Sequence, residues 1–162
     1  LAVDSEAATI AALWLARQFD EAHAGDERAA SVRRLATPVL KYWICKRAPQ
    51  HTNEAQECLG GLGYVEEHVL PRLYREAPVN SIWEGSGNVQ CLDVLRALAR
   101  SPETLDVLKA ELASARGANA AYDRACDELD AHVAAAVADE ARARVAVERI
   151  ALLVQAPSPP VA

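Results

Sequence analysis

The stretch from residue 53 to residue 96 decides the fold of this chain, and it reads NEAQECLGGLGYVEEHVLPRLYREAPVNSIWEGSGNVQCLDVLR. The run Gly60-Gly61-Leu62-Gly63 is too rich in glycine for a helix interior, so it predicts a turn that ends the helix before it. A short helix is expected over residues 66–75 and irregular chain over residues 77–83. Another helix is expected from Ser86 to Ala99, because apolar residues recur there at helical spacing.

The rest of the chain shows the same helical periodicity, without the sustained alternation that marks strands. The other expected helices cover residues 1–22, 28–47, 53–59, 102–116, 120–137 and 139–155. Pro38 predicts a kink or a late start in the second of these helices, and Pro49 predicts its end. Short connections place successive helices side by side, so the sequence predicts an all-α, antiparallel helix bundle.

The bulk composition excludes several classes of protein. The chain has 162 residues, of which 51% are hydrophobic and 25% charged, which suits one globular domain. Its formal net charge of −6 gives the whole chain no strong attraction to nucleic-acid phosphates. No apolar run approaches the roughly 18 residues needed to cross a bilayer, so no membrane partner is expected.

The cysteines show no metal-binding pattern. Cys45, Cys58, Cys91 and Cys126 form no Cys-x-x-Cys pair and no zinc-type spacing with histidine, so no metal site is predicted. They are expected to be buried, reduced thiols, which together with the lack of a signal-peptide pattern predicts a cytoplasmic location. The chain begins at Leu1 and contains no methionine, which we interpret as the sign of a fragment of a longer protein.

Two glycine-rich segments, residues 60–64 and 74–88, are not explained by packing. Glu84 lies just before an expected helix start, beside Gly85. The N-terminus of a helix offers unpaired N–H groups and a partial positive charge, so this position suits a base that faces an electron-rich cofactor. Two plainer alternatives remain: residues 60–63 are an ordinary turn, and Glu84 is a partner of the helix dipole. A dinucleotide-binding loop is excluded, because no strand precedes the glycines.

These segments resemble the signature region of the acyl-CoA dehydrogenase family, in its carboxy-terminal domain. That family carries Gln-x-x-Gly-Gly-x-Gly-Tyr/Phe, then Arg-Asp-Ala, then Tyr-Glu-Gly-Thr at the start of a helix. The corresponding segments here are Glu57-Cys58-Leu59-Gly60-Gly61-Leu62-Gly63-Tyr64, Arg75-Glu76-Ala77 and Trp83-Glu84-Gly85-Ser86. The sequence of residues 71–88 looks most like that of the AidB-like branch, which is associated with the DNA alkylation response.

The resemblance also implies a division of the chain. The family-like helical domain covers residues 1–100. Residues 101–156 are expected to be an additional helical segment packed on that domain, similar to the extra carboxy-terminal helices of the AidB-like branch. Residues 157–162, which contain Pro157, Pro159 and Pro160, are expected to be a disordered tail.

The resemblance implies a flavin-dependent oxidoreductase that acts on acyl-CoA thioesters. Glu84 occupies the position of the base that removes the α-proton while a hydride passes to FAD. A base of this kind works best when burial raises its pKa. The resemblance further implies that Ser86 and Asn88, at the family's Thr and Gln positions, contact FAD, and that Gly85 lets the flavin approach.

Other implied features concern the assembly of the cofactor site. Gly60 and Gly61 are expected to contact the FAD of a neighbouring subunit, and Glu57 replaces a glutamine on the adenosine side. The family's amino-terminal helical domain and middle β domain are not in this chain. The isolated chain is therefore expected to bind FAD weakly or not at all, and to be inactive.

Two further functions are open. Arg33, Arg34 and Lys41 fall near one face of an expected helix with no acidic residue from 28 to 49, so a DNA contact is a hypothesis for this basic surface. The alternative for the same residues is a solvated helix face. The third hypothesis is an assembly domain that forms a homo-oligomer through exposed apolar helix faces.

Overall fold

A computed structural model describes residues 1–156, and this part of the chain contains helices and no strand. The expected all-α fold is therefore confirmed. The elements are α1 (Ala2–His23), α2 (Glu27–Leu59), α3 (Gly61–Tyr64), α4 (Leu70–Glu76), η1 (Ala77–Ser81), α5 (Gly87–Arg100), α6 (Glu103–Leu112), η2 (Ala113–Ala115), α7 (Ala120–Ala138), η3 (Glu140–Arg142) and α8 (Ala143–Gln155). The tail expected at residues 157–162 lies outside the described residues.

Helix α2 is one continuous helix of 33 residues, so the predicted end at Pro49 and the separate helix at residues 53–59 were wrong. A proline inside a helix costs about 3 kcal/mol, because it removes a hydrogen bond and crowds the preceding turn. Tertiary burial offsets that cost at Pro38, which is buried against the neighbouring helices. Near Pro49, the Thr52 hydroxyl donates to the carbonyl oxygens of Ala48 and Pro49, at 3.0 and 2.9 Å.

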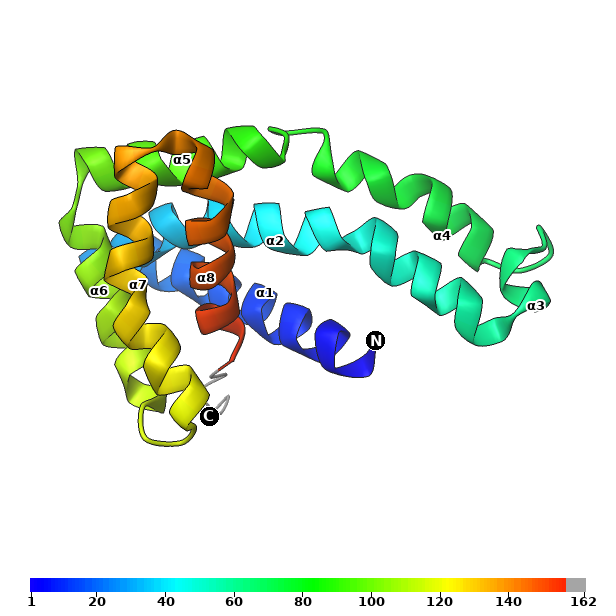
Figure 1. Cartoon of the computed structure of the whole chain (residues 1–162), viewed down its shortest axis with the longest axis horizontal. Helices are drawn as coiled ribbons and strands as arrows, with labels where there is room; N and C mark the ends of the chain where they lie inside the picture. The colour runs from blue at the N-terminus through cyan, green and yellow to red at the C-terminus, as the bar shows by residue number, and fades with distance from the viewer. Residues whose placement is uncertain (157–162) are drawn as a thin grey trace.

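The core lies where α2, α5 and α8 pack against one another, with α1, α6 and α7 around them (Figure 1). Leu35 and Val39 of α2, Val94 of α5 and Ile150 of α8 are each almost completely buried in one cluster. Side chains from before and after residue 100 thus share a core. The division at residue 100 stays a prediction, because a shared core neither requires nor forbids it.

The second half of α2, with α3, α4 and η1, forms an extended arm that leaves the body of the bundle (Figure 1). The arm consists of this part of α2 and the short elements that pack on it, and much of its apolar surface stays exposed. The exposed apolar side chains of the arm and its junction with α5 are Leu59, Leu62, Tyr64, Val65, Val69, Leu73, Tyr74, Val79, Ile82, Trp83 and Val89.

The connections in the arm differ from the expected ones. The predicted turn at residues 60–63 contains a single helical turn, α3, which follows Gly60. The helix predicted over residues 66–75 is the shorter α4, and the segment predicted as irregular begins with the 3-10 helix η1. Pro71 at the start of α4 explains its late beginning, since proline favours the first helical turn.

The cysteines are free, but only two are buried. Cys91 and Cys126 are in the core, whereas Cys45 is half-buried and Cys58 is exposed at the end of α2. The expectation of four buried thiols was therefore wrong for two of them. Within residues 1–156 no helix is long and apolar enough to cross a membrane.

We predict that Gly63→Ala destabilises the arm. A Cβ at Gly63 would clash with the carbonyl oxygen of Gln56 and would lie 2.8 Å from the Cα of Gln56, so the backbone would have to move. The expected loss is about 1–3 kcal/mol in the free energy of unfolding, measured by urea denaturation. Gly61→Ala is the matched control, because a Cβ there meets no atom within 4 Å. Equal stability of the two variants would contradict the prediction.

Candidate functional site

Glu84 has an unusual backbone conformation. It is the one residue other than glycine, among residues 1–156, with a positive φ, which is 54°. This left-handed conformation costs about 1–2 kcal/mol for a residue with a Cβ. Gly85 follows with a φ of 101°, so the two residues together turn the chain from η1 towards α5. Strain of this kind is often found at functional sites, where the surrounding structure holds it in place.

Gln90 holds this strained turn. Its side-chain Nε2 donates to the carbonyl oxygen of Glu84 at 2.8 Å and to that of Gly85 at 3.3 Å. A Cβ at Gly85 would lie 2.5 Å from the same nitrogen. Glycine is therefore favoured at position 85 for two reasons, the positive φ and the close approach of the Gln90 side chain. Gln90 was missed by the sequence analysis, because a polar residue in an amphipathic helix carries no signal that it binds a preceding loop.

The first turn of α5 presents hydrogen-bond donors next to this loop. Ser86 is the N-cap residue in an extended conformation, and its side chain makes no capping hydrogen bond. The first amide groups of the helix are therefore left for solvent or for a ligand. Together with the partial positive charge of the helix end, they suit an electron-rich or anionic acceptor.

Asn88 lies in the same turn of α5 and contacts helix α8. The Arg144 side chain of α8 donates from Nε to Asn88 Oδ1 at 2.7 Å. A Cβ at Gly87 would lie 3.2 Å from the ring of Tyr42, so α2 packs directly against the same turn of α5. Burial raises the pKa of the nearby Cys91 thiol to about 11, and the positive charge of Arg144 opposes that rise.

The structure separates the predicted site residues into two groups. Glu84, Gly85, Ser86 and Asn88 are at the junction between η1 and α5, whereas Gly60 and Gly61 lie at the far tip of the arm (Figure 1). No atom would lie within 4 Å of a Cβ at either of these two glycines, so the tip is open. This separation is compatible with contacts from the start of α5 to one cofactor molecule and from the arm tip to another.

Glu57 turns back along its own helix. Its Oε1 accepts from Asn53 Nδ2 at 2.7 Å, one helical turn earlier. The carboxylate that replaces the family's glutamine is therefore held against α2 near the arm tip.

The three basic residues considered for DNA contact point to three different partners. Arg33 lies over an aromatic ring of α1, at 5.1 Å from the ring centroid. Arg34 forms two hydrogen bonds with Asp93, at 2.8 and 2.9 Å, and this pair lowers the pKa of the Asp93 carboxyl. Lys41 donates to the carbonyl oxygen of Asn80. DNA binding by these residues stays a prediction, and their contacts inside the chain do not favour it.

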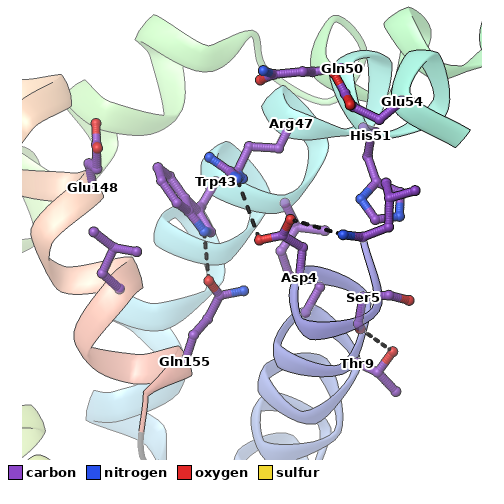
Figure 2. A pocket seen from close by; sticks show the side chains of 15 residues that line it. Asp4, Ser5, Thr9, Trp43, Arg47, Gln50, His51, Glu54, Glu148 and Gln155 are labelled. Carbon is purple, nitrogen blue, oxygen red and sulfur yellow. Dashed lines mark hydrogen bonds and ion pairs between the residues drawn. The ribbon is translucent and has the colours of Figure 1, made fainter. Parts of the chain in front are cut away.

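A cavity of about 740 Å³ lies between α1, α2 and α8, and Figure 2 shows it from close by. The Arg47 guanidinium lies 3.6 Å from the Asp4 carboxylate and over the ring of Trp43, while Trp43 Nε1 donates to Gln155 Oε1 at 2.7 Å. None of the predicted site residues lines this cavity. Within residues 1–156 the candidate site is an exposed surface at the start of α5, since Glu84, Ser86 and Asn88 are all exposed.

Comparisons with known proteins agree with the motifs at this surface. The model of the family described as "Acyl-CoA dehydrogenase, C-terminal domain" matches residues 1–99. The acyl-CoA dehydrogenase homologue AidB of Escherichia coli is 46% identical over 129 residues, which is 80% of this chain and 24% of AidB. Acyl-CoA dehydrogenase family member 11 of Caenorhabditis elegans is 46% identical over 81 residues, which is 50% of this chain and 13% of that protein.

The solved structures include a close match to the fold. The crystal structure of Caenorhabditis elegans ACDH-11 in complex with C11-CoA has a TM-score of 0.80 and 29% identity, over 94% of this chain and 29% of that one. The chain thus spans only about a quarter of the length of AidB and of the ACDH-11 structure. The match of the family model over more than half of the residues, supported by these relatives, shows that the chain belongs to the acyl-CoA dehydrogenase family and corresponds to its C-terminal domain.

Proposed function

We propose that this chain is the carboxy-terminal part of a flavin-dependent oxidoreductase of acyl-CoA thioesters, with Glu84 as the base that removes the α-proton. The observation that carries the proposal is the strained Glu84–Gly85 turn, held by Gln90 directly before the first turn of α5. Strained residues persist only where the surrounding structure holds them, and they cluster at active sites, which supports a functional role for Glu84. The strain fixes where the Glu84 side chain leaves the backbone.

The residues around Glu84 fit an FAD cofactor in the chemistry of their donors. The first turn of α5 and the Ser86 hydroxyl offer donors without a capping partner, which suits the phosphate and carbonyl oxygens of a flavin nucleotide. FAD, when bound, supplies the acceptor for the hydride that leaves the β-carbon of the thioester. Glu84 takes the α-proton, so the thioester loses one proton and one hydride and becomes an enoyl thioester.

Glu84 is exposed in this chain, and exposure is unsuitable for proton abstraction from carbon. A carboxylate that is to act as a strong base needs a site from which water is excluded. We infer that the remaining domains of the full-length protein cover Glu84 and complete the substrate site. A thioester of a fatty acid is the substrate class that fits, in line with the C11-CoA bound to the worm relative.

Glu84→Gln in the full-length protein is expected to lower the rate of flavin reduction by an acyl-CoA about 10²–10⁴-fold, because the amide cannot accept the α-proton. Flavin content should stay the same, since glutamine keeps the size of the side chain. Stopped-flow absorbance of the flavin measures the rate. Glu67→Gln is the control, an exposed carboxylate on the arm with no role in the proposal. A variant at Glu84 that reduces flavin at the normal rate would exclude this residue as the base.

The isolated chain of residues 1–162 is expected to bind FAD at least 100-fold more weakly than the full-length protein, because its site is an open surface and pockets bury most of a bound ligand. Titration followed by flavin fluorescence measures both dissociation constants. Tight binding by the isolated chain would show that the glycine-rich segments form a flavin site unaided. Absence of binding by both proteins would contradict the proposed function.

We propose assembly as a second role, which the exposed apolar residues of the arm favour. Leu62 and Tyr64 of α3 are 71% and 78% exposed, and Ile82 and Trp83 at the base of the arm are 64% and 58% exposed. An apolar surface of this kind costs free energy in water and is typical of an interface. A second copy of the chain, placed on the arm, would bury these side chains.

The chain is accordingly expected to self-associate, with a mass by light scattering that rises from monomer to dimer as concentration increases. Leu62→Ser should shift this association to a higher concentration, because it removes apolar surface from the arm. Leu13→Ser is the matched control, since Leu13 is 61% exposed on α1. A monomer at every concentration, or an equal effect of the two substitutions, would argue against the arm as the interface.

A further inference from the structure

We propose that Arg144 of α8 is a positioning residue that fixes the orientation of the Asn88 side-chain amide at the start of α5, and thereby aims the amide's donor group at the cofactor. This inference rests on the proposed function. It assigns a role to the segment beyond residue 99, where the match to the family model ends.

The direction of the hydrogen bond determines the orientation of the amide. Arg144 donates from Nε to Asn88 Oδ1 at 2.7 Å. An arginine side chain has five donor N–H groups and no acceptor, so only the oxygen of the Asn88 amide can face it. The Nδ2 group of Asn88 then faces away from Arg144 and is available as a donor. A donor at this position matches an acceptor such as a phosphate or carbonyl oxygen.

The two partners are held by rigid elements. Asn88 lies in the first turn of α5, which is anchored by the buried residues Cys91 and Val94 and packs on the ring of Tyr42. Arg144 lies in the first turn of α8, which is anchored by the buried residue Val147. Because both helices belong to one core, the bond joins two fixed positions that are 56 residues apart in the sequence.

Arg144 also keeps its charge available. No carboxylate of residues 1–156 forms an ion pair with Arg144, although six other arginines in this part of the chain have carboxylate partners closer than 3.2 Å, at Glu21, Glu111, Asp93, Glu76, Glu66 and Asp127. Its positive charge therefore adds to that of the α5 N-terminus instead of being neutralised. An anionic or electron-rich ligand at Asn88 is favoured by both, and the pyrophosphate of a flavin nucleotide has this chemistry.

The test compares the FAD dissociation constants of variants of the full-length protein. Asn88→Asp is the decisive variant, because Asp at this position pairs with Arg144 and favours the N-terminus of α5, yet offers no donor to the cofactor. We expect unchanged thermal stability and FAD binding weakened at least tenfold. A purely structural role of the contact predicts normal FAD binding in this variant, and that result would overturn the proposal.

Arg144→Ala is expected to weaken FAD binding about tenfold, the usual effect of losing one hydrogen bond to a charged group. It should also change the visible circular dichroism of the bound flavin. Arg149→Ala is the matched control, because Arg149 is an exposed arginine of the same helix and its substitution removes the same charge. Equal dissociation constants for the two variants would overturn the proposal. Arg144→Gln serves if the alanine variant does not fold, because its amide can donate or accept and no longer selects one orientation.

A double-mutant cycle separates positioning from direct contact. If Arg144 acts through Asn88, adding Arg144→Ala to Asn88→Ala has no further effect on FAD binding. Full additivity of the two substitutions would show that Arg144 does not act through Asn88. If the unmodified full-length protein binds no FAD, the proposed function itself fails and this inference fails with it. The dissociation constant of the unmodified protein therefore tells the two failures apart.

Discussion

Helix α2 runs without a break through Pro38 and Pro49, and the remaining elements take their positions from it. Helices α1, α5, α6 and α8 pack against it in the body, whereas α3, α4 and η1 pack along it in the arm. Burial of α2 side chains between Ala29 and Trp43 offsets the cost of the proline at position 38. The direction of the arm relative to the core is thus fixed by a single helix.

Helix α2 also contacts the elements on both sides of the candidate site, η1 and α5. Tyr42 packs against the first turn of α5, and Lys41 donates to the carbonyl oxygen of Asn80 in η1. These contacts hold both sides of the strained turn at Glu84, while Gln90 holds it from within α5. The cost of the left-handed conformation is therefore offset by several contacts around it, which explains how a non-glycine residue stays in this conformation.

Local patterns predicted most of the helices and the glycine-rich connections between them, since glycine density and helical periodicity act over a few residues. They failed at Pro49, where α2 continues although a proline usually ends or kinks a helix, because the packing of α2 against α3 and α4 is defined only by the tertiary fold. They also failed to find Gln90 and Arg144, whose partners are defined only after the helices pack. In α1 the apolar residues Leu13 and Phe19 are exposed, while the polar residue Gln18 is buried. The apolar pattern identified the helix correctly without identifying its buried side.

The shared core has a consequence for any shortened form of this chain. Val94 and Leu98 of α5 and Trp43 of α2 are buried in the cluster that α8 completes, and Trp43 bonds to Gln155 at the last position of α8. A relative whose chain stopped after the equivalent of Arg100 would expose these residues to water. A shortened chain that ends at residue 100 is therefore expected to need polar substitutions at these positions to stay stable in water.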